Sequence, residues 1–296
     1  MPSTLIADTR LLTAMLLLYA LLAAASLGVG MRSKRGSQLR SQVNAWWYIF
    51  PIVCLGLFLY PFGLSLLPLL IALLAIRELS AHFSGRPWRF GAGCAALLAL
   101  LALPPLLTGA GFDLPLYILP MLIAAQALHF AMRRQGNPLL FLLFLLLCFG
   151  IGFLPAFTRL PLAPATKLHW LFYLFVVTAL NDVAQFISGT LFGRHAVAAR
   201  ISPNKTWQGL AGGVLASMLL SLTLGLFLQL AVPPRLLALG LLLSIGGFLG
   251  DLTFSAAKRV LGIKDFSGLI PGHGGILDRV DSLVVTAPLL YAALTL

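Results

Sequence analysis

The C-terminal part of the chain contains five of its eight acidic residues. They are Asp182, Asp251, Asp265, Asp278 and Asp281. Asp278 and Asp281 are three positions apart, which places both carboxylates on one face of a helix. Carboxylates in this arrangement repel each other unless a cation lies between them, and hard oxygen ligands suit Mg²⁺ or Mn²⁺. The pair therefore indicates a divalent-cation site, with partial neutralisation by Arg279 as the structural alternative.

Two other aspartates lie in or at the end of apolar runs. Asp182 is flanked by Asn181 and Gln185 inside one run, and Asp251 ends another. A charged side chain in the bilayer costs roughly 2.5 to 3.5 kcal/mol on insertion scales, so such residues are functional candidates by default. The alternative is that each carboxylate pairs with a basic residue and holds two helices together.

A basic and glycine-rich segment precedes the last two aspartates. It contains Lys258, Arg259 and Lys264, followed by His273 flanked by Gly272, Gly274 and Gly275. Glycine permits positive φ angles and close approach of the backbone to a ligand, and consecutive N–H groups in such a turn can bind phosphate oxygens. Basic residues before the turn and aspartates after it predict a phosphate site. A simple turn between two helices is the alternative.

The segment Ile201-Ser-Pro-Asn-Lys-Thr-Trp207 is predicted to begin another helix. Ser202 is a favoured N-cap residue, and Pro203 suits the first helical position. This start places Lys205 in the first turn of the helix, at an end that attracts phosphate groups. The same residues are compatible with a capped helix start in which Trp207 belongs to the interfacial aromatic belt.

The composition requires that most of the outer surface contacts lipid. The chain is 60% apolar and 9% charged, whereas a soluble domain carries about 25% charged residues. Spanning helices need roughly 17 to 25 mostly apolar residues. The predicted spans are 11–30, 45–60, 61–76, 91–109, 114–132, 138–157, 168–189, 208–231, 236–254 and 282–296. This pattern predicts an all-α, polytopic membrane protein with about ten transmembrane helices, eight to ten being compatible, although the first run also resembles a cleaved signal peptide.

The basic residues predict the orientation of these spans. With ten spans, all but four of the 20 Lys and Arg residues fall on one side, which the positive-inside bias identifies as the cytosol. Both termini are then outside. The net charge of +12 needs no nucleic-acid partner, because the basic residues are scattered over short loops and form no continuous stripe.

The stretch from Ser255 to Asp281 resembles the signature of the phosphatidate cytidylyltransferases, also called CDP-diacylglycerol synthases. The resemblance rests on Lys258-Arg259, Lys264-Asp265, Pro271-x-His273-Gly-Gly and Asp278-Arg-x-Asp281. Asn181-Asp182, Phe192-Gly-Arg194, Ser202-Pro-x-Lys205-Thr-Trp and Gly250-Asp251 are similar to the preceding parts of the family pattern. The resemblance covers about residues 170–296, and the first 165 residues match only in being hydrophobic spans.

The resemblance implies a reaction and a set of roles. CTP and phosphatidic acid, or a related lipid phosphate, would give a CDP-lipid and pyrophosphate with one or two Mg²⁺ ions. The implied catalytic residues are Lys258, Arg259, Lys264, Asp265, His273 and Arg279. The implied substrate-binding residues are Ser202, Lys205, Thr206, Ser255, Gly272, Gly274 and Gly275. The implied metal ligands are Asp182, Asp251, Asp278 and Asp281.

The resemblance also implies an organisation and a location. Residues 1–165 would form N-terminal transmembrane helices, and 166–296 a catalytic transmembrane region whose active-site loops face the cytosol. We expect an integral protein of a bacterial inner membrane, in contact with membrane lipids, with homodimer formation as a further expectation and no nucleic-acid partner.

Several alternatives stay open at this point. Asn181-Asp182-Val-Ala-Gln-Phe186 departs from the version of this block in many bacterial members, which leaves room for a paralogue acting on another lipid phosphate. A polyprenol-kinase-like enzyme would leave the long signature unexplained, and the aspartate pattern of the CDP-alcohol phosphotransferases is absent. A transporter would bind its ion near the midplane, whereas the polar residues here gather at one surface. A non-catalytic homologue would not need the complete motif.

Overall fold

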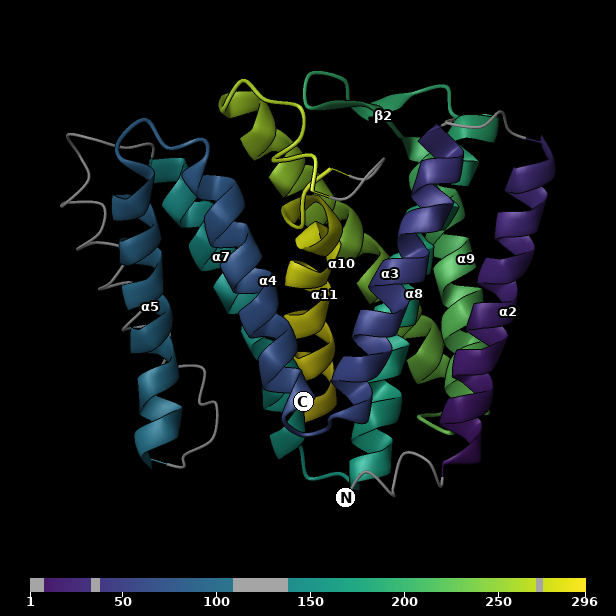
Figure 1. Cartoon of the computed structure of the whole chain (residues 1–296). Helices are drawn as coiled ribbons and strands as arrows, with labels where there is room; N and C mark the ends of the chain where they lie inside the picture. The colour runs from purple at the N-terminus through teal and green to yellow at the C-terminus, as the bar shows by residue number, and fades with distance from the viewer. Residues whose placement is uncertain (1–7, 33–37, 109–137, 270–273) are drawn as a thin grey trace.

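The chain folds into a bundle of long α-helices with one small β-hairpin (Figure 1). The computed structural model describes residues 8–32, 38–108, 138–269 and 274–296. The helices are α2 (Thr9–Arg32), α3 (Gln38–Phe58), α4 (Gly63–Ser80), α5 (Pro87–Thr108), α7 (Pro138–Ala156), the short 3₁₀ helix η1 (Phe157–Arg159), α8 (Pro164–Phe192), α9 (Trp207–Phe227), α10 (Pro233–Val260) and α11 (Leu277–Thr295). The strands are β1 (Ala196–Ala198) and β2 (Ser202–Thr206).

Six helices in the described ranges are long and apolar enough to cross a membrane. They are Thr9–Met31, Gly63–Ser80, Pro138–Arg159, Pro164–Phe192, Trp207–Phe227 and Pro233–Val260. This confirms an all-α integral membrane protein, but it does not confirm ten spans. Val43–Phe58 is apolar but shorter, and the predicted run 114–132 lies outside the described residues. Helix α11 begins with Asp278, Arg279 and Asp281 in its first two turns, which shortens its apolar part.

The helix predicted to have its N-cap at Ser202 begins four residues later, with its N-cap at Thr206. Residues Ser202–Thr206 form β2, which pairs antiparallel with β1. Thr206 is the N-cap of α9, because its backbone is extended (φ −117°, ψ 154°) and its Oγ1 accepts a hydrogen bond from the Gly209 N–H at 3.0 Å. The prediction of an N-cap at Ser202 was therefore wrong, and Lys205 lies on a strand instead of in a helical turn.

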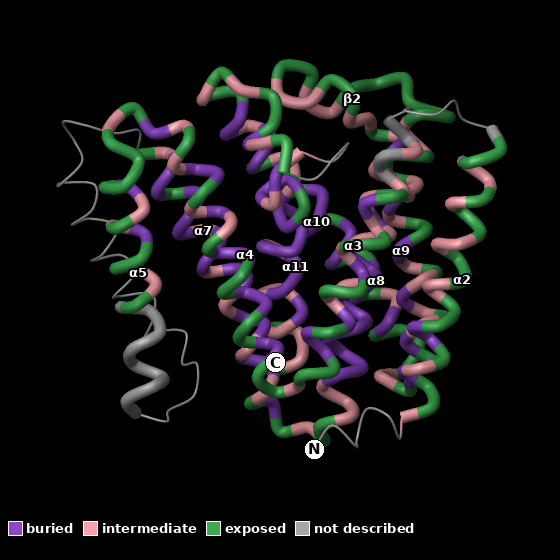
Figure 2. Tube along the Cα trace, viewed as in Figure 1, coloured by how far each residue is buried: buried purple, intermediate pink, exposed green. Residues whose placement is uncertain are grey.

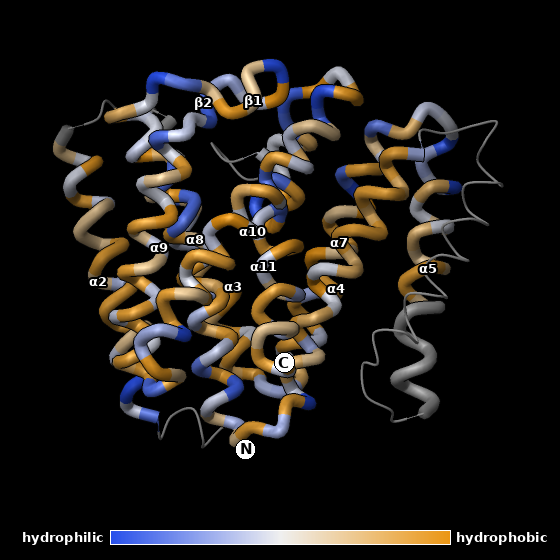
Figure 3. The backbone as a smooth tube through the Cα atoms, turned by 180° about the vertical axis from the view of Figure 1, so that it is seen from behind, coloured by the Kyte–Doolittle hydropathy of each residue, from blue (hydrophilic) through white to orange (hydrophobic). Residues whose placement is uncertain are grey.

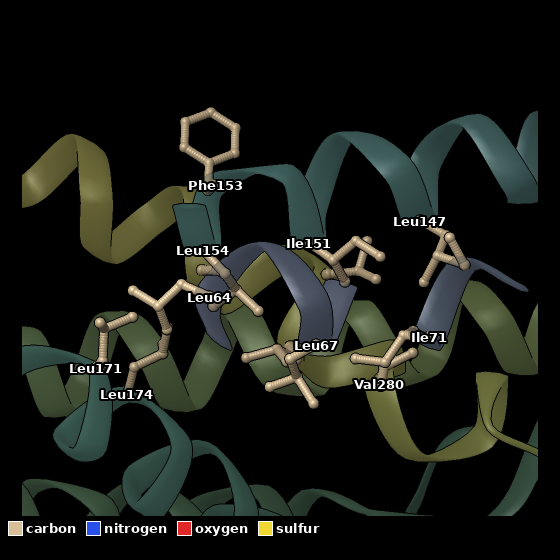
Figure 4. Packing of buried hydrophobic residues seen from close by; sticks show 14 of the residues in the cluster. Leu64, Leu67, Ile71, Leu147, Ile151, Phe153, Leu154, Leu171, Leu174 and Val280 are labelled. Carbon is tan, nitrogen blue, oxygen red and sulfur yellow. The ribbon is translucent and has the colours of Figure 1, made fainter. Parts of the chain in front are cut away.

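The buried core lies where α4, α7, α8, α10 and α11 meet (Figure 2). Figure 4 shows Val280 of α11 next to Leu67 and Ile71 of α4, with the α7 side chain Ile151 close by. All four side chains are at most 7% exposed. Helices from both halves of the sequence therefore share one core, so that α11 is held on one side by the N-terminal region.

The connections with most of the polar residues lie at one end of the bundle (Figures 1 and 3). These are the α4–α5 connection, the β1–β2 hairpin after α8, and the segment after α10. We call this the hairpin end. The arrangement agrees with the prediction that these loops share one side of the membrane, while the compartment that they face stays a prediction.

Candidate active site

One face of α10 contributes three polar side chains at helical spacing. Asp251, Ser255 and Lys258 are at positions i, i+4 and i+7, so they lie along one stripe. The Ser255 hydroxyl donates a hydrogen bond to Asp251 Oδ1 at 3.2 Å. Ser255 was predicted to bind substrate, and in this structure its hydroxyl orients a carboxylate.

Asp278, in the first turn of α11, is the carboxylate of this cluster that accepts the most hydrogen bonds. Lys258 Nζ donates to its Oδ1 at 2.6 Å, and the N–H groups of Phe266 and Gly275 donate to its Oδ2 at 3.2 and 2.9 Å. Asp278 is 6% exposed and Lys258 is 8% exposed. A buried pair of this kind needs such additional hydrogen bonds to offset the loss of hydration. Asp278 therefore joins α10, the α10–α11 segment and α11.

Asp182 and Asp281 approach each other across α8 and α11. The Ser282 hydroxyl donates to Asp182 Oδ1 at 3.2 Å and to the Gly247 carbonyl at 3.1 Å, which links three helices. Asp281 Oδ1 accepts the Ser282 N–H at 2.8 Å. Helix α10 comes very close here, because a Cβ on Gly250 would overlap the Asp281 carbonyl oxygen.

Lys205 brings the hairpin to the cluster. Its Nζ lies 2.6 Å from Asp251 Oδ2 and 5.1 Å from the centroid of the Phe248 ring. A cation near an aromatic face and a carboxylate is stabilised by both. The strand position of Lys205 therefore still delivers a positive charge to the site, although the helical turn predicted for it does not form.

These side chains surround a polar cavity of about 140 Å³. It is lined by Asp182, Asp251, Lys258, Asp265, Asp278, Arg279 and Asp281. The seven residues come from α8, α10, α11 and the segment between the last two, and each was a predicted catalytic or metal-binding residue. Three-dimensional folding thus brings residues up to 99 positions apart, Asp182 and Asp281, to one place.

The remaining predicted residues have different surroundings. Arg259 is exposed, with Nε donating to the Ile201 carbonyl at 2.9 Å and Nη1 to the Ile263 carbonyl at 3.1 Å, so it ties the hairpin to the end of α10. Lys264 is exposed, and the Thr206 side chain is used in the helix cap. His273 and Gly272 lie outside the described residues.

The two described glycines of the predicted phosphate turn are required by its shape. Gly274 has a φ of +79°, which residues with a Cβ rarely adopt. A Cβ on Gly275 would overlap the carboxylate of Glu78. The Gly275 N–H donates to Asp278, so in this structure a protein carboxylate takes the place that was expected for a phosphate oxygen.

The arrangement of the cavity agrees with the outcome of sequence comparison. The sequence profile described as the cytidylyltransferase family matches residues 40–296. The chain belongs to the cytidylyltransferase family. The match extends over α3, α4, α5 and α7 as well as the C-terminal helices, but not over α2. These four helices are therefore part of the family's common region, and the resemblance found in 170–296 was only a part of it.

Curated relatives of this family member include phosphatidate cytidylyltransferases. Those of Staphylococcus saprophyticus and Staphylococcus aureus (strain COL) are 41% and 40% identical over 143 residues, which are 48% of this chain and 53% of theirs. A protein named "Uncharacterized protein YnbB" from Escherichia coli (strain K12) is 46% identical over 119 residues, 40% of each chain. The matched region therefore spans about half of the length of these relatives, or less.

Three carboxylates of this cytidylyltransferase-family site have the oxygen chemistry that a hard divalent cation prefers. Asp182, Asp251 and Asp281 face one cavity from three helices, and the three ion pairs among the described residues involve neither Asp182 nor Asp281. Asp278 accepts three hydrogen bonds on its two oxygens, and the two oxygens of Asp251 are also engaged, by Ser255 and Lys205. In the described ranges, no three acidic, His or Cys side chains converge closely enough to form a complete set of ligands.

Two groups of residues near the site were missed by the sequence reasoning. Asn181 is 1% exposed, and its Oδ1 accepts hydrogen bonds from the hydroxyls of Ser217 (3.0 Å) and Ser244 (2.6 Å), which fixes α8 against α9 and α10 beside Asp182. Glu78 was interpreted as an interfacial residue at a helix end, but it is 4% exposed. Its position on the buried stripe of Leu67, Ile71 and Ala75 was the available signal.

Proposed function

We propose that this chain is a phosphatidate cytidylyltransferase, which converts CTP and phosphatidic acid into CDP-diacylglycerol and pyrophosphate. The observation that carries the proposal is the cavity at the hairpin end, where five aspartates and two basic residues meet at one end of an apolar helix bundle. A nucleotide and a lipid headgroup can both reach such a site, while the acyl chains remain in the bilayer. The names of the staphylococcal relatives support the same activity.

The proposed chemistry is an in-line displacement at phosphorus. A phosphate oxygen of the lipid forms a new bond to the α-phosphorus of CTP, and the bond from that phosphorus to the oxygen bridging the α- and β-phosphates breaks. Pyrophosphate leaves with the electron pair of that bond. The lipid phosphate is already ionised at neutral pH, so no strong general base is required. Positioning and neutralisation of charge then supply most of the rate enhancement.

The residues of the cavity have different roles in this reaction. Arg279 is exposed at the cavity and is suited to bind phosphate oxygens in a bidentate manner. Lys205 and Lys258 form ion pairs with Asp251 and Asp278, and their positive charges offset part of the negative charge of the aspartates. Asp182, Asp251 and Asp281 would bind the divalent cation, for which Mg²⁺ is our choice, and the bound ion would offset the charge of the transferring phosphates.

The location of the site follows from the same proposal. CTP is dissolved in the cytosol, so we assign the hairpin end and its basic residues to the cytosolic side of a bacterial inner membrane, with both termini outside. The proposal includes homodimer formation.

Two parallel experiments with CTP labelled at different phosphates test the reaction. Purified protein in nanodiscs receives phosphatidic acid, Mg²⁺ and CTP labelled either on the α- or on the γ-phosphate. We expect the α-label to move to the lipid and the γ-label to appear as pyrophosphate. Transfer of the γ-label to the lipid would instead indicate a lipid kinase, and activity only with polyprenyl or ether-lipid phosphates would identify a different substrate.

Divalent cations are expected to be essential for the transfer. Addition of EDTA in excess over Mg²⁺ should reduce CMP transfer to background, because the three cavity carboxylates then repel the triphosphate without a counter-charge. Restoring free Mg²⁺ should restore the rate, and the measurement is the transfer rate against free Mg²⁺ concentration. Undiminished transfer in EDTA would contradict a role for these carboxylates as metal ligands.

A further inference from the structure

Glu78 is a buried carboxylate in the N-terminal half of the chain that none of the proposed catalytic steps uses. It lies in the last turn of α4 and is 4% exposed. A buried carboxylate is costly unless several donors compensate for the lost water. Its partners therefore indicate what it does.

All three donors to Glu78 come from the α10–α11 segment and the first residue of α11. The Ser267 hydroxyl and the Ile276 N–H donate to Oε1 at 2.6 and 2.7 Å, and the Leu277 N–H donates to Oε2 at 3.2 Å. Leu277 is the first residue of α11. The first N–H groups of a helix have no partner within the helix and favour a negative charge. Glu78 thus caps α11 from a different helix.

A second contact from the end of α4 reaches the same segment. His82, four positions after Glu78 and one turn further along, forms a hydrogen bond through Nε2 with the Phe266 carbonyl oxygen at 2.7 Å. The neighbouring Phe266 N–H is one of the donors to Asp278. Glu78 and His82 therefore contact Phe266 and Ser267 on one side and Ile276 and Leu277 on the other.

This contact lies directly before the two cavity carboxylates of α11 in the chain. Asp278 and Asp281 follow Leu277 by one and four residues, so the start of α11 sets the position of both. Gly275 allows the contact, since a Cβ there would overlap the Glu78 carboxylate. Val280, between the two aspartates, packs near Leu67 and Ile71 of the same helix α4 (Figure 4).

We propose that Glu78 is a positioning residue for the transfer reaction, acting through the start of α11 and the glycine turn. This inference rests on the proposed function for its kinetic part, but its structural part can be measured without turnover. It assigns a role to the N-terminal helices, which the resemblance had left as plain membrane spans.

The test compares Glu78→Gln with Glu78→Ala, Ser267→Ala and the control Leu73→Ala. Leu73 lies on the same helix with 52% exposure and no part in the site.

Glutamine keeps one acceptor for Ser267 and Ile276 but turns an NH₂ group toward the Leu277 N–H. We expect kcat to fall about tenfold to a hundredfold in Glu78→Gln, since a small misplacement of catalytic groups has effects of this size, with the KM for CTP changed less than threefold. Ser267→Ala should lose about twofold to fivefold, because two of the three contacts remain.

Hydrogen exchange in nanodiscs separates positioning from general destabilisation. Peptides that contain residues 274–281 should exchange faster in Glu78→Gln and Glu78→Ala, while peptides from α7 and α9 should exchange as in the unmodified chain. Wild-type kcat in Glu78→Gln, or faster exchange throughout the bundle, would overturn the proposal. If the unmodified chain transfers no CMP, the proposed function fails, and the exchange of residues 274–281 still decides the capping role.

Discussion

Replacing Asp281 with asparagine is expected to reduce CMP transfer by about a hundredfold to a thousandfold, the loss typical of removing one group that stabilises transition-state charge. Asp281 faces the cavity. Among the described residues, its side chain accepts one hydrogen bond, from the neighbouring Ser282 N–H to Oδ1. Asparagine can retain that hydrogen bond, so the variant should fold. The measurement is transfer of the α-label of CTP to phosphatidic acid at saturating substrates.

A matched control removes a carboxylate from the other end of the bundle. Asp8 lies 2.6 Å from His169 Nε2, far along α8 from Asp182. Asp8→Asn should transfer CMP within about twofold of the unmodified chain, because the pair that it weakens contacts the first turns of α8 and no residue of the cavity. Turnover of Asp281→Asn within threefold of this control would refute the assignment of Asp281 to the reaction.

Replacing Asp278 with asparagine is expected to remove activity and also to destabilise the protein, in contrast to Asp281→Asn. Lys258, which is 8% exposed, would keep its charge without a partner, and breaking a buried pair by removing one member costs about 3–5 kcal/mol. The new NH₂ group would also face either Lys258 Nζ or the Phe266 and Gly275 N–H groups. Thermal unfolding in detergent measures the loss of stability beside the transfer assay.

The double variant Lys258→Met and Asp278→Asn distinguishes the two effects. Removing both charges should recover most of the lost stability, because no buried charge is left unpaired, and a double-mutant cycle gives the coupling between the two residues. CMP transfer should stay absent. Recovered activity in the double variant would mean that the pair only holds the helices together.

Local patterns in the sequence determined much of this protein. Runs of apolar residues predicted the helices, since a span must satisfy its backbone hydrogen bonds internally. The predicted runs 11–30, 138–157 and 168–189 each fall within a helix or overlap its bounds closely. The rarity of acidic residues in an apolar chain identified Asp182, Asp251, Asp278 and Asp281, all of which line one cavity. Each of these inferences depends on the cost of placing polar groups in lipid, which acts on every residue separately.

Pairing between distant segments was decided only by the tertiary structure. Ser202 and Pro203 have the composition of a helix start, but β2 pairs with β1 and moves the cap to Thr206. Asp278 and Glu78 accept hydrogen bonds from the consecutive N–H groups of Gly275, Ile276 and Leu277, although Glu78 comes from a distant helix. Hydrogen-bond partners separated by 198 residues, as in Glu78 and Ile276, leave no local pattern, because the energy of a contact depends on the distance in space and not along the chain.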